Sequence, residues 1–174
     1  MRDTFGHRLP LDKIRGGERI DLVADDAERE AIAERLGLSS LERLEANVTF
    51  ERDGPRIRAL GRVRAALEQC CIATDEPVAE HVDEPFEVIF LPEPNPDSTE
   101  EEIELAEEDC DVVFYDGATV DLGTAVADSL ALSVDPFPRS AGADAALREA
   151  GVLNEEEAGP FAALAKLRKG SDET

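Results

Sequence analysis

The sequence feature that most constrains the fold is a hairpin signal at Asp53-Gly54. Aspartate followed by glycine is typical of a two-residue β-hairpin turn when alternating segments lie on both sides, because both residues tolerate a left-handed backbone. Apolar and polar side chains alternate over much of 44–52 and 56–63. We therefore predict two long antiparallel strands with their loop at Asp53-Gly54.

This turn also predicts which residues of the two strands face each other. The expected apolar pairs are Phe50 with Ile57, Val48 with Ala59, Ala46 with Gly61, and Leu44 with Val63. The expected pairs on the other face are Glu51 with Arg56, Thr49 with Arg58, and Glu45 with Arg62. Opposite charges across strands stabilise the pairing, and a slip of one residue would expose the apolar set.

Helix signals lie on both sides of the hairpin. Asp25, with Glu28 three residues later, predicts a capped helix start, and Gly37 predicts the end of that helix. Asp121 predicts the start of a second helix. That helix should end before Asp135-Pro136, because the residue before a proline disfavours helical backbone.

The remaining segments predict short strands and two further helices. The strands are expected at 5–11, 19–23, 78–81, 86–91, 112–115 and 118–121, and the helices near 143–150 and from Pro160. Pro85 should separate two of these strands, and Asp116-Gly117 predicts a second hairpin. We assign the chain to the α+β class, with antiparallel β-hairpins forming a sheet or partly open barrel and helices at its periphery.

Length and charge set the domain organisation and the kind of partner. We expect one domain over 1–170, an acidic loop at about 93–111 and a disordered tail at 171–174. The chain has 41 acidic residues against 18 Lys and Arg, a net charge of −23, and no Lys or Arg between 75 and 116. Nucleic acids and anionic membranes repel such a molecule at long range. This favours a basic partner, or a small basic patch on an acidic body.

Few residues are available for catalysis or for a metal site. The two histidines, His7 and His81, are far apart in the sequence, so we predict no enzyme and no cofactor. Cys71 is followed at C-x-x-C spacing by Thr74, and Cys110 stands apart, so we predict no metal and free thiols. We expect neither a signal peptide nor a transmembrane helix, and we place the chain in the cytoplasm.

An arginine stripe is the candidate RNA-binding feature. Arg56, Arg58, Arg62 and Arg64 alternate with smaller side chains and therefore point off one face of the sheet. One interpretation is a solvated face neutralised by its neighbours. The other is phosphate contact, for which we select Arg58 and Arg64 as surplus charges, since the expected register gives glutamate partners to Arg56 and Arg62.

The order of several short motifs resembles that of a known family. These motifs are a strand containing Gly61, Cys71-x-x-Thr74 before Glu76-Pro77-Val78, Phe86 to Phe90, an acidic insert, Asp121-Leu122-Gly123, Leu130-Ala131-Leu132, Pro136-Phe137-Pro138-Arg139, and Pro160-Phe161-x-x-Leu164-x-x-Leu167. Together they resemble the YceD family, the large ribosomal RNA subunit accumulation proteins. The resemblance runs from about Phe5 to Leu167.

The resemblance implies a role in the accumulation or processing of large-subunit (23S) ribosomal RNA, and thus in ribosome biogenesis. It marks Cys71, Asp121, Pro138 and Arg139 as family-motif positions and supplies no catalytic residues. Many members carry a C-x-x-C where this chain has Cys71 and Thr74, and often a late cysteine pair; both pairs are incomplete in this chain. We therefore interpret Cys71 as a packing residue.

Two hypotheses follow for the partner. In the first, the chain binds large-subunit ribosomal RNA or a pre-ribosomal particle, using the face that carries Arg58 and Arg64. In the second, it is an acidic escort or adaptor for a basic ribosomal protein, using the acidic run at 100–111. Neither hypothesis involves a membrane or a small-molecule substrate.

Overall fold

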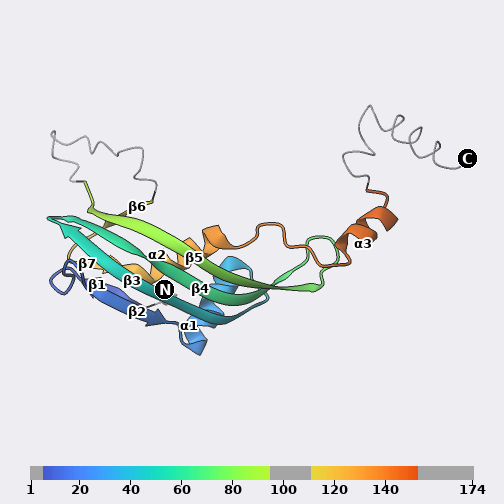
Figure 1. Ribbon diagram of the computed structural model, residues 1–174, viewed down its shortest axis with the longest axis horizontal. Helices are drawn as coiled ribbons and strands as arrows, with labels where there is room; N and C mark the ends of the chain where they lie inside the picture. The colour runs from blue at the N-terminus through green and yellow to red at the C-terminus, as the bar shows by residue number, and fades with distance from the viewer. Residues whose placement is uncertain (1–5, 95–110, 153–174) are drawn as a thin grey trace, which may run out of the picture. The chain divides into compact units, whose positions relative to one another are not determined.

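Long β-strands dominate the computed structural model, which describes residues 6–94 and 111–152 (Figure 1). The strands are β1 Arg8–Pro10, β2 Arg19–Val23, β3 Ser40–Asp53, β4 Arg56–Cys70, β5 Pro77–Pro92, β6 Val112–Tyr115 and β7 Thr119–Asp121. The helices are α1 Asp26–Leu36, α2 Leu122–Ser133 and α3 Ala143–Glu149. None of these helices combines the length and apolar character needed to cross a bilayer.

The chain divides into two compact units. The first unit is Met1–Gln69 with Ala79–Pro136, and the second unit is Cys70–Val78 with Phe137–Thr174. The predicted acidic loop lies almost entirely in 95–110, and the predicted last helix and tail lie in 153–174. The structure describes only residues 93, 94 and 111 of that loop and no residue of the last helix or tail, and the boundary at 170 stays a prediction.

A mixed five-stranded sheet, in the order β2-β3-β4-β5-β6, forms the centre of the first unit. β2 and β4 both pair antiparallel with β3, whereas β6 runs parallel to β5. β1 and β7 form a separate two-stranded antiparallel sheet. The α+β class is confirmed, and the sheet is not closed into a barrel by the described strands.

The β3–β4 hairpin forms as predicted, but its register differs by two residues. Asp53 pairs with Arg56, so the loop is Gly54-Pro55 rather than Asp53-Gly54. A turn over Asp53-Gly54 would need positive φ at both residues, and only Gly54 has it, at 58°. Proline fixes its own φ near −65°, which suits the second loop position after a left-handed glycine.

A shift of two residues leaves the predicted faces intact, because side chains alternate with a period of two. Phe50 still points into the core, but it faces Ala59 instead of Ile57. A register shift between Leu41 and Arg43 marks a β-bulge. The bulge lets Leu41 and Leu44, three residues apart, both be buried.

Two strand predictions were wrong because they rested on local signals alone. Pro85 does not break β5. The amides of Ile89 and Glu93 donate toward β6, and the amide position of Pro85 faces the same side. Since β6 reaches back only to Ile89, Pro85 interrupts no bond of that ladder. Gly117 does turn the chain, with φ 72°, but β7 pairs with β1 and not with β6.

The predicted helix ends are confirmed. Asp25 and Glu28 form a capping box, and Gly37 closes α1 in the left-handed conformation. The carboxylate of Asp121 accepts a hydrogen bond from the Thr124 amide at 2.9 Å at the start of α2. α2 ends at Ser133, and α3 lies where the short helix was predicted.

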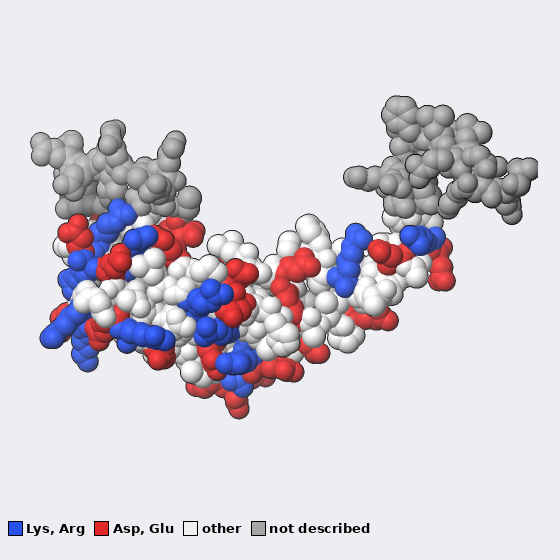
Figure 2. Space-filling view, in the orientation of Figure 1, with Lys and Arg blue, Asp and Glu red and all other residues white. Residues whose placement is uncertain are grey.

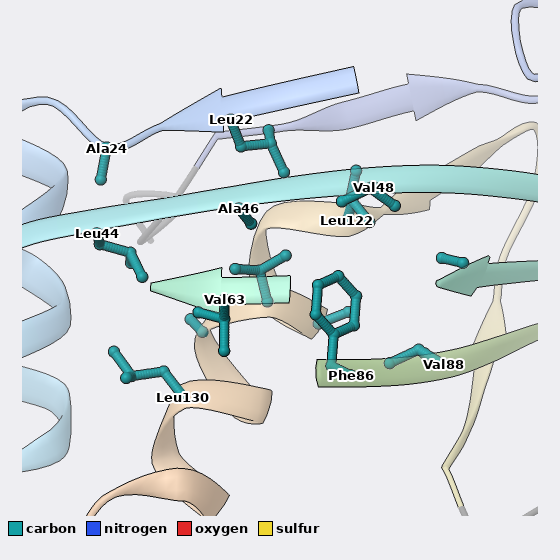
Figure 3. Packing of buried hydrophobic residues seen from close by; sticks show 14 of the residues in the cluster. Leu22, Ala24, Leu44, Ala46, Val48, Val63, Phe86, Val88, Leu122 and Leu130 are labelled. Carbon is teal, nitrogen blue, oxygen red and sulfur yellow. The ribbon is translucent and has the colours of Figure 1, made fainter. Parts of the chain in front are cut away.

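The core fills the space between the sheet and the two helices α1 and α2 (Figure 3). It is aliphatic with a few aromatic rings, and its members include Leu44, Val63, Phe86, Leu122 and Leu130. Gly61 is required in this packing, because a Cβ there would overlap the carbonyl oxygen of Asn47. The opposite face of the sheet carries the arginine stripe.

Candidate functional site

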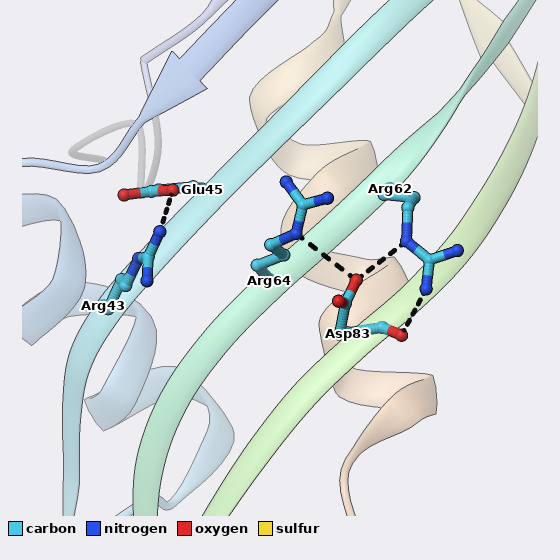
Figure 4. A network of polar contacts seen from close by, with 5 residues as sticks. All are labelled: Arg43, Glu45, Arg62, Arg64 and Asp83. Atoms are coloured by element: carbon cyan, nitrogen blue, oxygen red, sulfur yellow. Dashed lines mark hydrogen bonds and ion pairs between the residues drawn. The ribbon is translucent and has the colours of Figure 1, made fainter.

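The outer face of the sheet, on the side away from α2, carries a network of arginines and carboxylates (Figure 4). We call it the arginine face. Its basic residues are Arg43 of β3 and Arg56, Arg58, Arg62 and Arg64 of β4, and its acidic residues are Glu45, Glu51, Asp83 and Glu87. Alternation along the strands places these side chains on the outer face.

Arg58 binds two carboxylates from the neighbouring strands. Its Nε donates to Glu87 of β5 at 2.5 Å, and its Nη1 donates to Glu51 of β3 at 3.2 Å. Glu51 lies directly opposite Arg58 in the observed register. The hydrogen bond to Glu87, followed by the one to Glu51, raises the pKa of Arg58 above its ordinary value.

Arg62 and Arg64 share the carboxylate of Asp83. The Nε atoms of Arg62 and Arg64 lie 2.8 Å and 3.4 Å from Asp83 Oδ1, and Arg62 also donates to the Asp83 carbonyl. The hydrogen bond from Arg62 is the main cause of a lowered pKa at Asp83. Arg43 donates to Glu45 at 2.6 Å, and this bond lowers the pKa of Glu45.

These contacts overturn the reason for selecting Arg58 and Arg64 as surplus charges. Arg64 faces Glu45, which had been assigned to Arg62, and Arg58 faces Glu51, which had been assigned to Arg56. Arg56 instead faces Asp53. Figure 2 shows acidic and basic side chains intermixed on the visible surface. An RNA phosphate would have to displace carboxylates from guanidinium groups that already form charge-assisted hydrogen bonds.

Asp121, a family-motif residue, has a structural position in the first unit. Besides capping α2, its carboxylate lies 3.6 Å from Arg8 of β1. The amides of Leu122 and Gly123 both donate to the carbonyl of His7, which ties the start of α2 to the segment before β1. This motif therefore builds the joint between α2 and the two-stranded sheet.

The other three family-motif residues lie together in the second unit. The carbonyl of Pro138 accepts a hydrogen bond from the Ile72 amide at 3.0 Å, and Arg139 lies 3.4 Å from Asp144. The Cys71 side chain is only 1% exposed. Its sulfur accepts hydrogen bonds from the amides of Ser140, at 3.2 Å, and Ala73, at 3.4 Å.

The hydrogen bonds to the Cys71 sulfur favour its charged form. The Ser140 amide, with Thr74 next in importance, lowers the pKa of the Cys71 thiol from 9.0 to about 6. Thr74 Oγ1 also contacts Ser140 Oγ at 3.1 Å and donates to Glu76 at 3.1 Å. Hydrogen bonds from Ser140 and Thr74 lower the pKa of Glu76.

The residues around Cys71 do not form a metal site. Within 6–94 and 111–152, no group of three or more His, Cys, Asp and Glu residues could hold a metal ion. The sequence prediction of no metal stays a prediction for the whole chain.

Sequence reasoning missed Ser140 and Asp83. Ser140 is far from Cys71 in the sequence, and nothing local indicates the contact. Asp83 could have been predicted only from the pairing of β4 with β5, because its carboxylate contacts Arg62 and Arg64 on the neighbouring strand.

A comparison with protein families gives one match. The family model described as "Large ribosomal RNA subunit accumulation protein YceD" matches residues 59–168. The matched span takes in most of β4, all of the later described elements, and Cys71, Asp121, Pro138 and Arg139. Comparisons with curated proteins and with solved structures found no match.

Proposed function

The chain belongs to the YceD family, and we propose that it is a non-enzymatic ribosome-biogenesis factor supporting the accumulation or processing of large-subunit ribosomal RNA. The observation that carries this proposal is the family match over 59–168, which includes most of β4, all of β5 and α2, and the second-unit residues Cys71, Pro138 and Arg139. The name of the family indicates a ribosome-related role. That this role is non-enzymatic and directed at large-subunit RNA is our proposal.

We propose further that the chain acts on a pre-ribosomal particle rather than by capturing bare RNA. The net charge of −23 opposes the approach of any polyanion. Binding to RNA gains much of its free energy when cationic side chains release the counterions condensed on the phosphates. On the arginine face, Arg58, Arg62 and Arg64 already hold carboxylates, so this gain is reduced.

The alternative, an acidic escort for a basic ribosomal protein, has an observation of its own in its favour. β5 and β6 both lie in the span 75–116, which contains no Lys or Arg. The charged side chains that these two strands present to a basic protein are therefore acidic. We place either activity in the cytoplasm, because a chain with three cysteines, two of them adjacent, suits a reducing environment.

A tagged pull-down from cells at low and high salt tests the proposal, with the recovered RNA sequenced and the recovered proteins identified. We expect large-subunit ribosomal RNA together with large-subunit proteins. After nuclease treatment the proteins should remain bound. Recovery of RNA without ribosomal proteins would contradict binding to a pre-ribosomal particle. Recovery of one basic protein without RNA would support the escort hypothesis.

The arginine face is tested in the same assay. Arg58→Gln with Arg64→Gln should leave the recovery of ribosomal RNA within about twofold of wild type, because both side chains are neutralised by carboxylates. Lys13→Gln with Arg15→Gln is the matched control, since it removes the same charge from exposed positions that precede β2 and lie outside the sheet. A loss confined to the first variant would identify Arg58 and Arg64 as the RNA contact.

A further inference from the structure

An apolar groove lies between α2 and the last strand of the sheet, β6. It is a cavity of about 160 Å³ that opens to solvent. Its lining residues come from β5, β6 and α2 and include Val88, Val113, Ala125 and Leu132. Val113 pairs with Phe90 in the parallel register, so it points to the same side of the sheet as the core and α2.

The groove exposes apolar side chains that the described residues of the first unit, 6–69, 79–94 and 111–136, leave accessible. Leu132, on α2, is 80% exposed, and Val113 is 40% exposed. On the other face of β6, Phe114 is 49% exposed. Apolar side chains gathered at one edge of a sheet, rather than scattered singly, are typical of an interaction site.

β6 also offers backbone hydrogen-bonding groups to a partner. The carbonyls of Asp111 and Tyr115 accept hydrogen bonds from β5, and the alternating pattern of a strand turns Val112 and Phe114 the other way. The strand order ends at β6, and no described strand pairs with its outer edge. An extended polypeptide can add to such an edge and place alternate side chains in the adjoining groove.

Charge at the groove selects the chemistry of the partner. Asp111 and Asp128 lie in its lining. Arg35 of α1 pairs with Asp128 at 3.0 Å, while β5 and β6 themselves contribute no Lys or Arg. A second copy of this chain would bring another net charge of −23, and RNA would bring its phosphates. A basic polypeptide with apolar side chains is the complementary partner.

We propose that the groove between α2 and β6 binds an extended basic segment of a partner protein, which pairs with the outer edge of β6 and packs an apolar side chain against Leu132. The inference rests on the proposed function only for the source of that partner, a basic protein of the ribosome. Its test uses no ribosome, so the docking site and the ribosomal role can fail separately.

The test uses a short fluorescent peptide in which lysine and valine alternate, and its affinity for the full chain is measured by anisotropy. We expect binding to this peptide and much weaker binding to oligolysine or to a peptide alternating glutamate and valine. Leu132→Asp should weaken binding about tenfold, because the apolar anchor is lost. A purely electrostatic attraction would instead strengthen, since the variant adds a negative charge.

Val23→Asp is the matched control. Val23 is 66% exposed on β2, the strand at the opposite edge of the sheet, and its change adds the same charge outside the groove. Its affinity for the peptide should match that of wild type. Equal effects of the two changes, or no binding of the lysine–valine peptide, would overturn the proposal.

Amide hydrogen exchange on the unmodified chain gives a second and independent readout. Peptide binding should slow exchange at Val112 and Phe114, whose amides face the outer edge of β6. Exchange at Val113, whose amide faces β5, should change little. Protection at β2, or none at β6, would show that the peptide does not add to this edge.

Discussion

The sulfur of Cys71 shows how one residue can differ from what its sequence context indicates. An incomplete C-x-x-C suggested a residue that only packs. The structure gives the sulfur two backbone donors, one from Ala73 nearby and one from Ser140 across the second unit. A thiolate accepts such hydrogen bonds better than a neutral thiol does, which is the physical cause of the lowered pKa.

The pH dependence of stability should reveal this thiolate. Its pKa is about 6 in the folded chain against 9.0 without these contacts, so the stabilisation is complete above pH 9 and is lost as the pH falls to 6. In urea unfolding under reducing conditions, the free energy of unfolding of wild type should exceed that of Cys71→Ala by an amount that grows from pH 6 to pH 9. Cys70→Ala, at the exposed neighbouring cysteine, should show no such trend. If the difference in the free energy of unfolding between wild type and Cys71→Ala stays constant with pH, Cys71 is not a thiolate in the folded chain.

Gly61 is the other residue whose role depends on close packing. Gly61→Ala would put a methyl group onto the Asn47 carbonyl oxygen and 2.9 Å from the Phe86 ring, so the β3 backbone must move. We expect a loss of about 1–3 kcal/mol in the free energy of unfolding. Gly16→Ala is the control, since its nearest atom is 3.9 Å away. Similar unfolding midpoints for both variants would contradict this packing.

At the scale of elements, the observed register of the β3–β4 hairpin makes a specific prediction. A double-mutant cycle on Glu51→Gln and Arg58→Gln should give a favourable coupling, because these residues face each other and their side chains are bonded. The same cycle on Glu45→Gln and Arg62→Gln should give none, since Glu45 faces Arg64. Coupling between Glu45 and Arg62 alone would support the register expected from the sequence and contradict the observed one.

Elements whose signals are local were predictable, and pairings between distant segments were not. The capping box at Asp25 and the cap at Asp121 each depend on a few adjacent residues, and both helices begin there. The hairpin was found, but its loop moved by one residue because Pro55 suits the turn better than Asp53 does. The parallel pairing of β6 with β5 had no local signal, since strand partners across a long connection are chosen by the whole core.

At the scale of the whole molecule, charge distribution argues for a protein partner. Arg58, Arg62 and Arg64, which looked like an RNA patch, are held by carboxylates of the two neighbouring strands, β3 and β5. Predicting this from the sequence required the correct register and the position of Asp83 on β5. The family itself was recognisable from the order of short motifs, because order and spacing survive where single motifs are incomplete.

The central claim, a role in accumulating large-subunit ribosomal RNA, is tested most directly in cells depleted of this protein. The measurement is the ratio of mature large-subunit to small-subunit ribosomal RNA, with the wild-type chain resupplied as the control. We predict that the ratio falls on depletion and recovers with the wild-type chain. A ratio that stays unchanged while the protein is absent would contradict the account.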